Sequence, residues 1–167
     1  MDENNSNFSN INGQNLTFDI KKSNGYLRIS ISKNIPFMYY ISAFLVLLIN
    51  LLLLICSNTV SISLGLIILL YLTYSIINLV TTEELQVIKG FGYQIGQRSF
   101  IKENKTFIPY EKVQETFINE VIHKNRIIFL VSLLIKQENE MEIVPIFTGL
   151  IPRLNCLTII YNELKIL

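Results

Sequence analysis

The stretch NIPFMYYISAFLVLLINLLLLICSNTVSISLGLIILLYLTYSIINLVTT, residues 34–82, decides the fold, because it contains no Asp, Glu, Lys, Arg or His. At about 1.5 Å of rise per helical residue, its first apolar run, residues 35–56, is about as long as the hydrocarbon core of a bilayer is thick. A second apolar run, residues 62–80, follows a short polar segment and has a similar length. The pattern therefore predicts a transmembrane helical hairpin over residues 34–82.

The alternative for this stretch is a buried helical pair in a soluble protein. That alternative does not explain why Leu, Ile and Val surround both helices and leave no polar stripe for water. Within the two runs, Asn50 and Asn78 are the polar exceptions. We expect them either to hold the two helices together or to contact a helix of a partner.

The segments on either side of the hairpin differ in composition. Residues 1–15 are rich in Asn and Ser and are expected to form a disordered tail. Residues 16–33 alternate apolar and polar side chains around a Ser-Asn-Gly turn, so they form either a small hairpin that docks on the later domain or a surface segment. Residues 83–167 are long enough for one small domain.

The C-terminal segment shows the pattern of short strands followed by a helix. Residues 85–95, 107–110, 116–122 and 142–147 are predicted strands, and residues 127–135 are too short for a third crossing and favour a central strand. Residues 150–164 have the apolar spacing of an amphipathic helix. The predicted fold class is therefore an α+β membrane protein, with the hairpin followed by a small pleckstrin-homology-like antiparallel β domain and a C-terminal helix.

Basic residues predict the orientation of the chain. Lys and Arg residues precede the first run and follow the second, whereas the segment between the runs is uncharged. By the positive-inside rule, both termini are expected to face the cytosol.

The sequence offers poor material for catalysis. His123 is the only histidine and lies beside Lys124 and Arg126 in a polar connection, where it is expected to be a solvated turn residue. The two cysteines, Cys56 and Cys156, form no metal-binding pattern. We therefore predict no catalytic residues, no metal and no cofactor, and the absence of a basic, aromatic-rich run argues against nucleic-acid binding.

Four motifs together resemble one family. They are TTEELQVIKGFGYQ (81–94), FIPYEKV (107–113), INEVIHKNRIIFL (118–130) and LIPRLNCLTIIYNEL (150–164). In this order and spacing they resemble the PIG-H family, a component of the phosphatidylinositol N-acetylglucosaminyltransferase complex. Lys89 and Ile151 depart mildly from the family pattern, which usually has Arg and Leu there.

The resemblance implies an accessory, non-catalytic subunit at the endoplasmic reticulum membrane, in the first step of glycosylphosphatidylinositol (GPI) anchor biosynthesis. Its partners would be a catalytic glycosyltransferase subunit and other small membrane subunits, with phosphatidylinositol nearby. The matched positions are candidates for partner contact or for shaping the fold: Glu84, Gly90, Gly92, Pro109, Asn119, Glu120, Pro152 and Arg153. For Glu120 and Arg153, an internal ion pair is the alternative to partner contact.

Two other functions stay open at this point. The chain could be an independent membrane-tethered lipid-binding or scaffold module, since fold does not decide function. Such a module needs a basic pocket, and Lys102, Lys105 and Lys112 form the nearby cluster. The chain could also be an enzyme whose site the sequence does not reveal.

Overall fold

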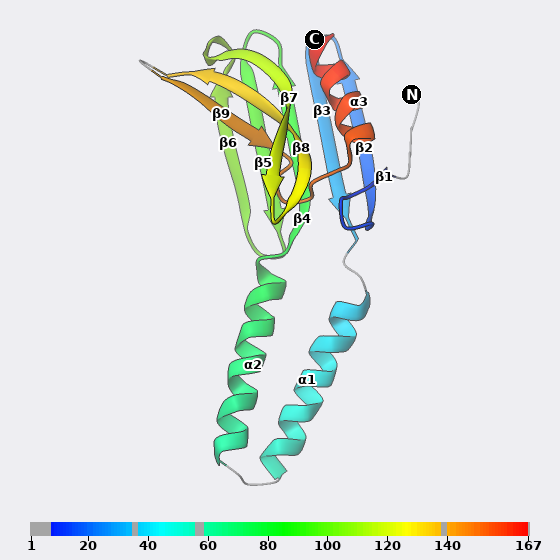
Figure 1. The fold of residues 1–167 in the computed structure, drawn as a ribbon, viewed down its shortest axis with the longest axis vertical. Coiled ribbons are helices and arrows are strands. Elements are labelled where there is room, and N and C mark those ends of the chain that lie inside the picture. Colours follow the sequence, from blue (N-terminus) through cyan, green and yellow to red (C-terminus); the bar gives the residue numbers. More distant parts are fainter. Residues whose placement is uncertain (1–7, 35–36, 56–58, 138–139, 167) are drawn as a thin grey trace. The chain divides into compact units, whose positions relative to one another are not determined.

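The computed structural model describes residues 8–34, 37–55, 59–137 and 140–166 (Figure 1). The chain divides into two compact units. A β unit is built from the described parts of residues 1–34, 80–98 and 103–167, and a helical unit is built from residues 35–79 together with 99–102.

The β unit contains two sheets. In the first sheet, the strands lie side by side in chain order: β1 (Phe8–Ser9), β2 (Asn15–Ser23), β3 (Tyr26–Lys33), β4 (Val80–Ile88), β5 (Gly92–Ser99) and β6 (Glu103–Pro109). A short 3-10 turn, η1 (Tyr110–Lys112), leads into the second sheet. That sheet is antiparallel and consists of β7 (Val113–His123), β8 (Arg126–Lys136) and β9 (Met141–Ile146), with β8 in the centre. Helix α3 (Leu154–Lys165) follows.

The apolar core follows the two periodicities of strand and helix. Along β3, Leu27, Ile29 and Ile31 are buried and alternate with partly exposed residues, as expected for a sheet with one covered face. Helix α3 buries residues at helical spacing, among them Cys156 and Ile160. One hydrophobic cluster therefore includes residues of both sheets and of α3.

The segment before the helices belongs to the β unit. The β2 and β3 strands form an antiparallel hairpin whose turn contains Gly25, with φ of +75°. Strand β3 then pairs with β4 in antiparallel register, which places Ile29 opposite Leu85. The hairpin over residues 16–33 thus docks on the strands that follow the helices. Of the tail expected to be disordered, residues 8–15 include β1 and the start of β2, and residues 1–7 lie outside the described residues.

The helical unit contains α1 (Phe37–Ile55) and α2 (Thr59–Ile77), which pack on each other. Their described side chains include exposed large apolar groups, such as Phe44 and Tyr71.

The predicted transmembrane hairpin over residues 34–82 is not supported by the structure. Within the described ranges, no helix meets the length and apolarity that a membrane crossing requires. The sequence argument treated nearly the whole uncharged stretch as two crossing segments. In the structure that stretch is divided between α1, α2 and the beginning of strand β4 at Val80.

The predicted fold class is therefore wrong and is corrected to a mainly β structure with additional helices. The small β domain was expected to form from residues 83–167 alone. Instead its first sheet takes three strands from residues 8–33, because the apolar face of the β2–β3 hairpin is buried in the common core.

Glu83 ties strand β4 to the segment that precedes α3. Its Oε1 accepts a hydrogen bond from the backbone N–H of Gly149 (3.0 Å), and its Oε2 accepts one from Leu150 (2.9 Å). The Gln97 side-chain amide donates a third, longer bond of 3.3 Å. The residue is only 5% exposed. A buried acceptor that satisfies two backbone donors fixes the position of both segments.

Replacing Glu83 by Ala should destabilise the β unit. The substitution leaves the buried N–H of Leu150 without its partner, and each such loss costs about 1–3 kcal/mol. We expect the free energy of unfolding of the full chain to fall by about 2–4 kcal/mol in chemical denaturation followed by circular dichroism. Glu120→Ala, on an exposed position of β7, is the matched control and should change it by less than about 0.5 kcal/mol. Equal effects of the two substitutions would contradict this role for Glu83.

The same residue predicts a pH dependence. Burial raises the pKa of the Glu83 carboxyl, and the hydrogen bonds from Gly149, Leu150 and Gln97 oppose this rise. The folded state therefore holds the proton more tightly than the unfolded chain does. The contribution of this group to stability is full below the unfolded pKa and is lost as the pH rises through the raised folded value. Between about pH 4 and about pH 7, the wild type should lose stability relative to Glu83→Gln. A constant difference between the two unfolding free energies would contradict the prediction.

Candidate interaction surface

Exposed aromatic side chains gather where β5 and β6 meet η1. Phe91, Phe107 and Tyr110 are 64%, 50% and 40% exposed, and we call these three residues the aromatic surface. The rings of Phe91 and Phe107 lie 5.3 Å apart between centroids. Tyr110 stacks on Tyr93, with centroids 6.0 Å apart and ring planes 13° apart, and Tyr93 is buried. The aromatic surface therefore rests on a ring that belongs to the core.

Two predicted site glycines shape the turn that carries Phe91. Gly90 has φ of +76°, a conformation that side chains disfavour, and it lies in the turn between β4 and β5. Gly92 has no room for a side chain: a Cβ there would lie 2.6 Å from both the carbonyl oxygen of Ile108 and the ring of Phe107. The absence of a Cβ at Gly92 thus lets the Phe107 ring lie against the backbone.

Pro109 belongs to the same site. It pairs with Gly92 at the end of β6, where a missing N–H is tolerated. Directly after it, the backbone N–H of Tyr110 donates to the carbonyl oxygen of Phe91 over 3.2 Å. The structure therefore brings Gly90, Gly92 and Pro109 together as the backbone support of the aromatic surface.

A polar groove borders the aromatic surface. It has a volume of about 270 Å³ and is lined by Tyr93, Tyr110, Thr116, Tyr161 and Lys165, among others. Exposed aromatic residues are enriched at protein–protein interfaces, where they supply much of the binding energy. The arrangement is therefore typical of a contact surface.

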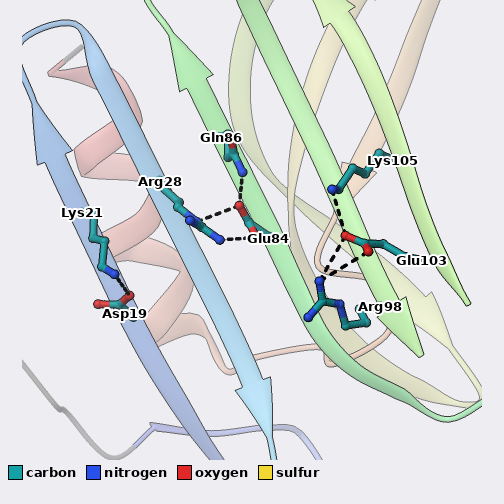
Figure 2. Close-up of polar contacts among 8 residues, drawn as sticks. All are labelled: Asp19, Lys21, Arg28, Glu84, Gln86, Arg98, Glu103 and Lys105. Atoms are coloured by element: carbon teal, nitrogen blue, oxygen red, sulfur yellow. Dashed lines mark hydrogen bonds and ion pairs between the residues drawn. The ribbon is translucent and has the colours of Figure 1, made fainter. Parts of the chain in front are cut away.

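Glu84 lies elsewhere, between β3 and β4. Its Oε1 lies 2.7 Å from the Nε of Arg28, and its Oε2 accepts a hydrogen bond of 2.9 Å from the Arg28 Nη2, as Figure 2 shows. The Gln86 amide also donates to this carboxylate. The hydrogen bond and charge of Glu84 raise the pKa of the Arg28 guanidinium. Glu84 thus links the strands before and after the helices, and its side chain already has internal partners.

A second ion-pair cluster changes the view of the lipid-binding alternative. Glu103 lies 2.9 Å from Lys105 and 3.3 Å from Arg98, and these cations lower the pKa of the Glu103 carboxyl (Figure 2). Of the cluster Lys102, Lys105 and Lys112, the second member is therefore paired within the chain. This pairing weakens the case for a basic pocket there.

Asn119 and Glu120 lie on β7, opposite Leu130 and Phe129 of β8. Glu120 is exposed, and in the described part of the chain its carboxylate makes no ion pair. The side chain is therefore available for contact with a partner.

Pro152 and Arg153 contact the N-terminal segment. Pro152 forms an isolated antiparallel bridge with Asn10. The backbone N–H of Arg153 donates to the Ser9 carbonyl and its Nε donates to the Asn10 carbonyl, each over 3.2 Å. Arg153 therefore makes internal hydrogen bonds at the start of α3.

Asn50 and Asn78 donate hydrogen bonds to backbone carbonyls one turn earlier. The Asn50 amide bonds to Val46 over 2.8 Å, and the Asn78 amide bonds to Tyr74 over 2.9 Å. Each side chain thus places one donor on the local backbone.

Sequence reasoning missed Glu83 and Asn10. Glu83 was interpreted as part of a solvated face, although it has the same strand parity as the buried Leu85 and Val87. That alternation was the available signal. Asn10 is 4% exposed, and its Oδ1 accepts the N–H groups of Asn12 and Gln14, closing a loop before β2. No pattern within the Asn-rich segment distinguished Asn10 from its neighbours.

The side chains that bind metals do not gather in the described ranges, where no group of three or more His, Cys, Asp or Glu could hold an ion. Burial raises the pKa of the Cys156 thiol to about 12, so this cysteine stays protonated at neutral pH.

Comparison with known proteins defines the class first. Residues 84–148 match a family model described as the PIG-H component of the GPI-GlcNAc transferase complex. The chain is 33% identical over 86 residues to the H component of phosphatidylinositol N-acetylglucosaminyltransferase from Mus musculus and 34% identical to that from Homo sapiens, covering 48% of this chain and 46% of the mouse and human proteins. It is 32% identical over 96 residues to the gpi15 component of the same transferase from Schizosaccharomyces pombe, covering 56% of this chain and 59% of that protein.

These matches confirm the predicted resemblance: the chain carries a PIG-H family domain. The chain spans about half the length of the mammalian relatives it matches. The comparison with solved structures found no significant match.

Gly92→Ala should disturb the aromatic surface, because the added Cβ meets backbone and ring atoms at 2.6 Å. We expect the free energy of unfolding to fall by about 1–3 kcal/mol, as for other overpacking substitutions. Gly96→Ala on the same strand is the matched control, since its Cβ would meet neighbours only at 3.7 Å or more. Thermal unfolding of both variants checks this. A Gly96→Ala variant that loses as much stability as Gly92→Ala would contradict the steric argument.

Proposed function

We infer that this chain is an accessory, non-catalytic subunit of the GPI-GlcNAc transferase complex. In this role it would support the transfer of N-acetylglucosamine from UDP-N-acetylglucosamine to phosphatidylinositol, the first step of GPI-anchor biosynthesis. The observation that carries the proposal is the match of residues 84–148 to the PIG-H component of that complex.

The aromatic surface supports a role in assembly. All three of its residues lie within the matched region, and they are exposed although their rings are large and apolar. Burying such rings against another protein is favourable, whereas leaving them in water is not. The proposed partners are the catalytic glycosyltransferase subunit and other small subunits of the complex.

The proposed location is the endoplasmic reticulum membrane, where a complex acting on phosphatidylinositol meets its lipid substrate. The orientation with both termini in the cytosol stays a prediction from the basic residues around the uncharged stretch.

A pull-down in gentle detergent tests the proposal. The tagged full chain should recover a glycosyltransferase subunit together with activity that converts UDP-N-acetylglucosamine and phosphatidylinositol to the N-acetylglucosaminyl lipid. The double variant Phe91→Ser, Phe107→Ser should reduce the recovered enzyme by at least about tenfold, because truncating interface anchors costs about 2 kcal/mol or more.

Met141→Ser is the matched control for that variant. Met141 is 59% exposed on β9 and also lies within the matched region, but outside the aromatic surface. Its substitution should leave recovery unchanged. Two results would contradict the proposal: recovery of the chain without a glycosyltransferase, or transfer activity from the purified chain alone.

A further inference from the structure

The tip of the β7–β8 hairpin is an exposed apolar and cationic surface that the proposed assembly does not use. Ile122 and Ile127 lie directly opposite each other and are 81% and 62% exposed. The two residues therefore present adjacent aliphatic side chains on one face of the hairpin. Between them the chain reads His-Lys-Asn-Arg, all of it exposed.

The turn keeps its charge at a cost in backbone energy. Lys124 and Asn125 have φ of +47° and +60°, the left-handed pair that a two-residue hairpin turn requires. Gly and Asn are favoured at such positions, and Lys is uncommon there. A cation is therefore present where a neutral residue would fit the turn better.

The cations at the tip have no acidic partner in the described part of the chain. The ion pairs there involve other residues, and neither Lys124 nor Arg126 takes part in one. Glu120 is the nearest acidic residue along β7, and it lies opposite Phe129, away from the turn. The tip therefore carries uncompensated positive charge beside its two isoleucines.

An apolar groove extends this surface. It has a volume of about 300 Å³ and is lined mainly by apolar groups, with Ile127 near Ile11, Pro152 and Leu154. The exposed Arg153 also lines it. Apolar surface thus continues from the tip toward the start of α3 and has a further cation at its border.

We propose that this hairpin tip, with Ile122 and Ile127 flanked by Lys124 and Arg126, inserts into the surface of a bilayer that carries anionic lipid. Aliphatic side chains gain by leaving water for the boundary of the acyl chains, and neighbouring Lys and Arg are attracted to anionic headgroups. A specific protein interface needs about 20–30 residues on each side. A two-residue turn with one aliphatic pair is much smaller than that and suits shallow insertion. The inference does not depend on the proposed subunit function.

The lack of tryptophan in the chain allows a reporter specific to the tip. Ile122→Trp places one indole at the tip, and Met141→Trp, at a 59% exposed position on β9, is the matched control. Each full-length variant, kept in solution by an amphipathic polymer, is mixed with vesicles of phosphatidylcholine brominated in the acyl chains, with or without phosphatidylserine. The measurement is quenching of tryptophan fluorescence by bromine.

We expect strong quenching of Ile122→Trp in the vesicles that contain phosphatidylserine. In neutral vesicles, or after adding Lys124→Ser and Arg126→Ser, quenching should fall at least severalfold, and Met141→Trp should be quenched little. Equal quenching at the two positions, or equal quenching in neutral and anionic vesicles, would overturn the proposal. An emission shift of Ile122→Trp with polyglutamate but not with vesicles would also overturn it and would indicate an acidic protein partner.

Discussion

The buried carboxylate of Glu83 is the constraint on which the β unit depends. It holds the backbone of Gly149 and Leu150 against β4, and this fixes the chain just before α3 begins. A carboxylate out of water is costly unless its oxygens are satisfied, and here three donors satisfy them. The first sheet and the C-terminal helix are therefore joined by polar contacts as well as by the apolar core.

Alternation and helical spacing were enough to predict much of the β unit. The β2–β3 turn, the central position of β8 and the helix after Pro152 follow from local patterns. The pairing of β3 with β4 does not, because it joins residues separated by the whole helical unit. Arg28 and Glu84 are complementary only once that register is known. The fold class failed because uncharged length was taken to mean membrane crossing.

The surfaces and their supports have different origins along the chain. Phe91, Phe107 and the isoleucines of the hairpin tip lie within the region matched by the PIG-H model. Residues that hold this region in place, among them Arg28 and Leu150, lie outside it. A local match therefore captures the contact-bearing strands but not the segments that complete the domain. Extending the comparison to those segments requires the structure.

The pairing of β3 with β4 also has a consequence for the architecture of the chain. Ser32 lies opposite Thr82, so residues 35–79 leave the sheet from one strand and return to its immediate neighbour, about 4.8 Å away. Topologically, β2, β3 and β4 are a simple meander in which one hairpin loop has been enlarged to hold two helices. The helical unit is thus an insertion. It could be lengthened, exchanged or reduced to a tight turn without rethreading any strand of the domain that carries it.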